Sequence, residues 1–70
     1  MPTFSPVLVS IMRTVLEETM TKVPSEQATT LTKVHLAEFI LKAAAEGVTS
    51  YEGLAAAALD QLPSILSMFM

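Results

Sequence analysis

The sequence predicts an all-α fold, a small domain of three helices with the second helix at the centre and a kink in the third. Three segments carry apolar residues at helical spacing, and short breaks containing Pro24 and Gly47 separate them. No stretch alternates apolar and polar residues for long enough to indicate a half-buried strand. A chain of 70 residues has room for one domain. We therefore expect one helical domain over residues 1–70, with helices at about 6–22, 25–46 and 50–68.

A capping residue and a proline mark the start of the first predicted helix. Ser5 is a good N-cap, and Pro6 suits the first helical position because its missing N–H would have no partner there. Apolar residues then recur within an arc of about 180° on a helical wheel. They are Leu8, Ile11, Met12, Val15, Leu16, Met20 and Val23. This pattern predicts an amphipathic helix.

The boundaries of the second helix follow from a glycine and a threonine-rich segment. Gly47 stands where a left-handed residue commonly ends a helix. The start is open between Ser25 and a later position, because Thr29, Thr30 and Thr32 are poor helix formers that can also cap.

The second helix is apolar around most of its circumference. Its polar residues fall on one narrow stripe, which we call the polar stripe: His35, Glu38, Lys42 and Glu46. Apolar and alanine residues fill the remaining arc of about 240°. A helix of this kind must be covered on several sides, so we predict that it is central, that Phe39 and Ile40 are buried, and that the polar stripe is solvated.

The third helix has a predicted capping box and an internal proline. Thr49 is the expected N-cap and Glu52 the residue three positions later that completes the box. Pro63 is expected to break the helix or to start a fourth one. However, Ile65 and Leu66 continue the same apolar arc, with Pro63 outside it. We favour one kinked helix over two separate helices.

Composition argues against several kinds of functional site. The chain has no cysteine, which excludes disulfides and thiolate metal sites. His35 is the only histidine, and no carboxylate falls in an apolar arc, so we expect no metal site, no cofactor and no catalytic acid. Gly47 and Gly53 are the only glycines, so there is no phosphate-binding loop. We expect that the protein is not an enzyme.

The N-terminal region lacks the order of charges that a secretory signal needs. Arg13, the first basic residue, comes after the first apolar run rather than before it. No segment reaches the roughly 20 apolar residues of a membrane span. We expect a soluble cytoplasmic protein.

Part of the chain resembles a known class of DNA-binding domain. An alanine-rich stretch at 43–45 is followed by Gly47, by Thr49 and Ser50, and by an apolar-Ala-x-x-Ala pattern within 54–58. In outline, residues 36–69 resemble the start of the DNA-binding domain of tetracycline-repressor-type regulators, which implies a regulator-like helical domain. The family's glycine turn and basic reading helix are absent, and no Lys or Arg follows Lys42. DNA binding is therefore the alternative function, and no nucleic acid partner is expected.

The leading interpretation is a small non-catalytic helical module that self-associates or binds a protein partner. An apolar ligand held between the helices stays open as a third interpretation. Helix 25–46 and the apolar C-terminal end offer more apolar surface than three packed helices are expected to cover, so we predict a two-fold homodimer. The predicted interface residues are Ile40, Ala44, Leu66, Met68 and Phe69.

Overall fold

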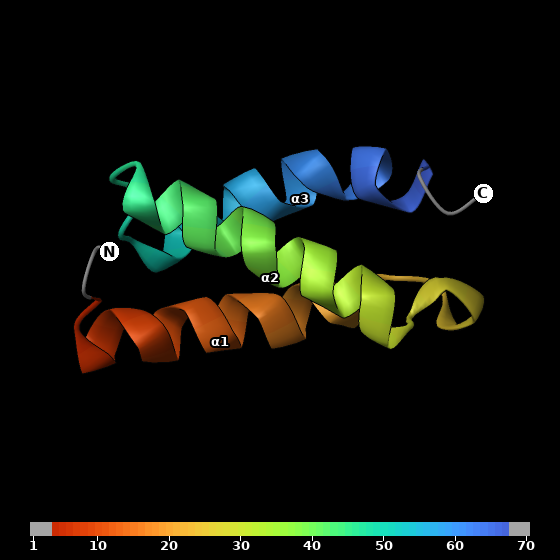
Figure 1. Ribbon diagram of the computed structural model, residues 1–70, viewed down its shortest axis with the longest axis horizontal. Helices are drawn as coiled ribbons and strands as arrows, with labels where there is room; N and C mark the ends of the chain where they lie inside the picture. The colour runs from red at the N-terminus through yellow and green to blue at the C-terminus, as the bar shows by residue number, and fades with distance from the viewer. Residues whose placement is uncertain (1–3, 68–70) are drawn as a thin grey trace.

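A computed structural model describes residues 4–67 of the chain (Figure 1). These residues form three α-helices, with a short 3₁₀ turn, η1 (Ser25–Gln27), between the first two. The helices are α1 (Pro6–Met20), α2 (Thr30–Ala45) and α3 (Tyr51–Ser67). Within 4–67 there is no strand, which confirms the predicted all-α fold.

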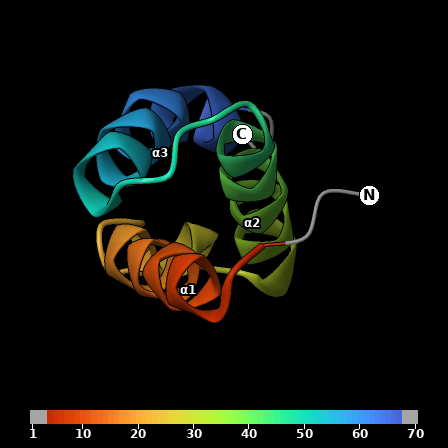
Figure 2. The same ribbon diagram turned by 90° about the vertical axis from the view of Figure 1, so that its left-hand side faces the viewer.

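The three helices run alternately up and down and pack in a triangle (Figures 1 and 2). The bundle is elongated, 34 Å along its longest axis and 19 Å along each of the others. α2 contacts both α1 and α3, but each helix of the triangle contacts the other two, so the predicted central position does not distinguish α2. Because α1 and α3 contact each other, α2 is left with an outward-facing side.

The N-terminus of α1 matches the prediction from sequence. Ser5 has an extended backbone, and its hydroxyl accepts a hydrogen bond of 3.1 Å from the N–H of Leu8. Pro6 occupies the first turn. The cap therefore satisfies one of the backbone donors that a helix start leaves without an intrahelical acceptor.

The structure places the start of α2 at Thr30, so the prediction of a helix from residue 25 is wrong. The Thr29 hydroxyl caps the helix by accepting from the N–H of Thr32 at 3.2 Å. The Thr32 hydroxyl donates to the carbonyl of Gln27 at 2.7 Å and so ties the preceding turn to the helix. Threonine hydroxyls compete with helical hydrogen bonds, which is why this segment caps α2 instead of extending it.

The end of α2 is a Schellman motif at Gly47. This glycine has a φ of 108°, a conformation that is strained for other residues. The N–H of Gly47 donates to the carbonyl of Ala44 at 3.1 Å, and the N–H of Val48 donates to Ala43 at 3.0 Å. The two bonds satisfy the last carbonyls of α2 and turn the chain toward α3.

The N-cap of α3 is Ser50 and not Thr49, so that part of the capping prediction is wrong by one residue. The Ser50 hydroxyl accepts from the N–H of Gly53 at 3.0 Å. The helix then continues through Pro63 to Ser67 without interruption. One helix instead of two is the arrangement that the sequence favoured, and the kink at Pro63 stays a prediction.

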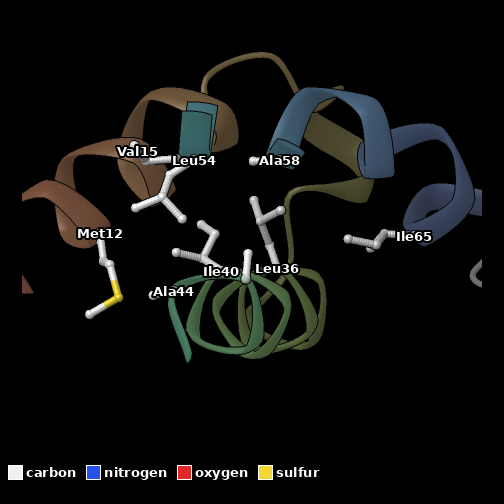
Figure 3. Close-up of a cluster of buried hydrophobic side chains, with 9 residues drawn as sticks. Met12, Val15, Leu36, Ile40, Ala44, Leu54, Ala58 and Ile65 are labelled. Atoms are coloured by element: carbon white, nitrogen blue, oxygen red, sulfur yellow. The ribbon is translucent and has the colours of Figure 1, made fainter. Parts of the chain in front are cut away.

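The core lies along the axis of the bundle, and all three helices contribute to it (Figure 3). Leu36, Leu54 and Ala58 have no exposed surface. Ile40 is 2% exposed, as predicted, but Phe39 is only half-buried. The prediction for Phe39 is wrong because this residue lies about 100° around the helix from Ile40, at the edge of the buried face.

Candidate functional site

An open groove lies between α1 and α2. Its volume is about 230 Å³. The residues that line it are Val9, Met12, Arg13, Leu16, Ala37, Ile40 and Leu41. Arg13 is the only charged side chain among these, so the groove is an apolar surface with one cation.

The helical spacing of the lining residues explains how the groove forms. Residues three and four apart lie on one face of a helix, and Val9, Met12 and Leu16 follow this spacing along α1. On the opposite wall Ala37 ends at its Cβ, whereas Leu41, one turn later, is large. The short alanine side chain leaves the space between the two helices unfilled.

The groove has a buried floor and an exposed apolar rim. Met12 and Ile40 form the floor and belong to the core. Val9 and Leu41 form the rim, and their side chains are 38% and 46% exposed. The packing of this chain therefore covers only part of Leu41.

The apolar surface continues along α2 beyond the groove. Val34 is 44% exposed and lies on the same side of α2 as Ala37 and Leu41, at positions i, i+3 and i+7. On α1, Arg13 and Glu17 are exposed one turn apart. We call this side of the bundle the α1–α2 face: Val9, Arg13, Leu16, Glu17, Val34, Ala37 and Leu41.

The polar stripe of α2 lies mostly in water, as predicted. Glu38, Lys42 and Glu46 are exposed, and His35 is half-buried and engaged in an interaction. Among residues 4–67, no group of three or more histidines and carboxylates is placed to hold a metal ion.

A polar contact joins the start of α3 to α1. The Tyr51 hydroxyl donates a hydrogen bond to the Glu18 carboxylate, which lies on the side of α1 away from Arg13. This contact ties α3 to α1, and Glu18 is therefore occupied within the chain.

The residues predicted for a dimer interface are divided between the core and the C-terminus. Ile40 and Ala44 are buried within one chain, and Leu66 is half-buried. Met68 and Phe69 lie outside the described residues. A dimer that keeps this fold would therefore contact α2 through other side chains.

Sequence reasoning did not single out the exposed rim of the groove. The wide apolar arc of α2 included Val34 and Leu41 but gave no reason to separate them from the core residues. The signal was present in α1, where Val9 precedes Arg13 by one turn and extends the apolar arc toward a charged residue.

The fold and the groove define a class, a three-helix bundle with an open apolar face. No protein-family model, no curated protein and no solved structure matches the chain. No helix within residues 4–67 is long and apolar enough to cross a membrane. What the chain does is therefore inferred from its own surface.

Proposed function

We propose that the chain is a small non-catalytic helical module that binds a protein surface, either a second copy or another protein, through the α1–α2 face. The observation that carries this proposal is the apolar groove with Leu41 exposed on its rim. Contiguous apolar surface that is bordered by charged residues is typical of protein-binding sites.

The chemistry of the groove supports binding over catalysis. Arg13 is the one charged side chain among the residues that line it. It can pair with a carboxylate but does not exchange protons during a reaction. The rim residues Val9 and Leu41 are exposed to solvent, so the groove does not enclose a reacting group.

The alternative of DNA binding has less support from the arrangement of charge. In that interpretation the reading helix would correspond to residues 62–67, at the C-terminal end of α3. α3 carries Glu52 and Asp60, and none of its residues is Lys or Arg. A helix of this charge would be repelled by phosphates.

Site-specific photocrosslinking in the cells that produce the chain tests the proposal. A photoreactive side chain replaces Leu41 on the α1–α2 face or Leu59 on α3, which is exposed to a similar degree, 42%. We expect a discrete protein adduct from position 41 and none from position 59. The same pattern of adducts from both positions, or none from position 41, would contradict the proposal.

Native mass spectrometry of the purified chain distinguishes a protein partner from a small apolar ligand in the same groove. A constant extra mass of a few hundred daltons on every chain would assign the groove to a ligand and overturn protein binding. We expect masses that correspond to the polypeptide alone.

A further inference from the structure

We infer that the α1–α2 face binds a second copy of this chain, packed antiparallel about a two-fold axis, with Arg13 of each copy paired with the partner's Glu17. This inference rests on the proposed function and specifies its partner. It follows because the apolar residues and the charges of this face would match those of the same face on a second copy.

The exposed face of α2 is symmetric about its own centre. Val34 and Leu41 are large apolar residues seven positions apart, and Ala37 lies between them, three positions from Val34 and four from Leu41. In an antiparallel pair of α2 helices, Val34 therefore comes opposite the partner's Leu41, and Leu41 opposite the partner's Val34. The short side chain of Ala37 lets the two backbones approach closely at the crossing point.

The exposed face of α1 carries a reciprocal pair of charges. Arg13 and Glu17 are four residues apart on one side of the helix and both are exposed. An antiparallel two-fold axis that passes between them sets Arg13 opposite the partner's Glu17 twice in each dimer. Beside apolar surface, an Arg–carboxylate pair is strengthened by the exclusion of water.

A single two-fold axis can relate α1 to the partner's α1 and α2 to the partner's α2. α1 and α2 run antiparallel (Figure 1), so the Leu16 end of the groove wall on α1 lies beside the Ala37 end of the wall on α2. The midpoint of Arg13 and Glu17 is next to Leu16, and the midpoint of Val34 and Leu41 is next to Ala37. The midpoint of the charged pair on α1 and the midpoint of the apolar pair on α2 therefore lie side by side across the groove. A single two-fold axis can pass through both.

The face is large enough for a stable pair. The described chain has a surface of 4567 Å². One side of a three-sided bundle is about a third of that area, or about 1,500 Å², and a standard interface buries about 800 Å² from each partner. Each copy has a net charge of −3. Within the face the charges of Arg13 and Glu17 cancel, and the exposed Glu38, four positions from Val34 and three from Leu41, borders it on the polar stripe.

Charge reversal in the purified chain of 70 residues tests the pairing. Sedimentation equilibrium should show a dimer for the natural sequence. Arg13→Glu and Glu17→Arg should each weaken the dimer by about tenfold or more, because each variant opposes like charges at two places. An equimolar mixture of the two variants should form a heterodimer of near-natural affinity, and so should the doubly reversed chain with itself.

Two controls separate pairing from general effects of charge or folding. Lys42→Glu changes the net charge as much as Arg13→Glu does but lies on the polar stripe, and it should leave the dimer unchanged. Circular dichroism reports the helical content of every variant. If Arg13→Glu loses its helical content, then Arg13→Gln, which removes the charge only, takes its place and should also weaken the dimer.

The outcomes distinguish this inference from the proposed function. A chain that stays monomeric at hundreds of micromolar while position 41 crosslinks to a different protein overturns the inference and leaves the function standing. A dimer that neither charge reversal weakens means that another surface pairs, and this also overturns it. If the chain forms no dimer and position 41 gives no crosslink, both the inference and the proposed function are overturned.

Discussion

Thr32 is a buried polar residue, and its hydroxyl has a specific structural role. Its side chain is 1% exposed, and it lies near the Thr29 hydroxyl while donating to the carbonyl of Gln27. Among the described residues, no buried side-chain nitrogen or oxygen lacks a partner, and this hydrogen bond is one reason. It fixes the turn before α2 against the first turn of that helix.

Replacement of Thr32 by valine should therefore destabilise the protein although valine has nearly the same shape. The Gln27 carbonyl would lose its donor, at a cost of about 1–2 kcal/mol in the free energy of unfolding. Thr32→Ser, which keeps the hydroxyl, should cost less than Thr32→Val. Urea denaturation measures both, with Thr30→Val at an exposed neighbouring position as the control. A loss of stability no larger for Thr32→Val than for Thr30→Val would disprove this role.

At the level of single residues, features that depend on neighbouring positions could be predicted from the sequence, and features that depend on tertiary contacts could not. Ser5 next to Pro6 is a local signal, and the structure confirms it. Thr32 is also a good capping residue, but its hydroxyl is instead used by the carbonyl of Gln27, five residues earlier. No local pattern contains that information.

At the scale of the element, periodicity predicts the helices better than their ends. The repeating apolar residues specify which segments are helical, because burial of a continuous face requires that spacing. The start of α2 depends on competition between threonine hydroxyls and backbone hydrogen bonds, which differ little in energy. Likewise Thr49 and Ser50 are both good caps, and only the geometry of the turn after Gly47 selects Ser50.

The groove was beyond prediction because it depends on how two helices are rotated against each other. Val34 and Leu41 share an apolar arc with Ile40 and Ala44. A helical wheel alone does not separate the buried residues of this arc from the exposed ones. The contact between α1 and α3 closes the triangle and decides which of them face outward. Consequently the sequence predicted surplus apolar surface but placed it on buried residues of α2.

Pro63 in α3 should limit the stability of this helix. It is exposed, so its ring makes no essential contact with the core, yet it removes one backbone donor and crowds the preceding turn. Pro63→Ala should therefore raise the free energy of unfolding by about 1–3 kcal/mol. Thermal denaturation measures the change, with Ser64→Ala as a control for helix propensity alone. A lower melting temperature for Pro63→Ala would mean that the proline positions Ile65 in the core.

For the whole molecule, stability should depend on the residues where the three helices meet. Leu36 has no exposed surface and faces the core from α2 (Figure 3). Leu36→Ala should cost about 2–5 kcal/mol, which is a large part of the stability of a domain of this size. Phe39→Ala should lower the free energy of unfolding by less than the usual range for a fully buried aromatic residue. Leu31→Ala, at a position 55% exposed, should lower it by about 0.5 kcal/mol or less. Equal losses for Leu36 and Leu31 would contradict the packing described.

Folding and association of this chain should be coupled. A domain of this length has a thin margin of stability, and a partner that binds only the folded state adds to it by mass action. If the α1–α2 face pairs two copies, the melting temperature should rise with protein concentration, by about 4–5 °C for each tenfold increase.

Leu41→Asp should abolish this dependence, because a carboxylate on the rim of the groove would be buried beside apolar surface in the pair. Leu59→Asp, at a similarly exposed position on α3, should keep it. Differential scanning calorimetry over a hundredfold range of concentration measures the effect for all three chains. A melting temperature of the natural chain that does not change over that range would show that each copy folds without the other.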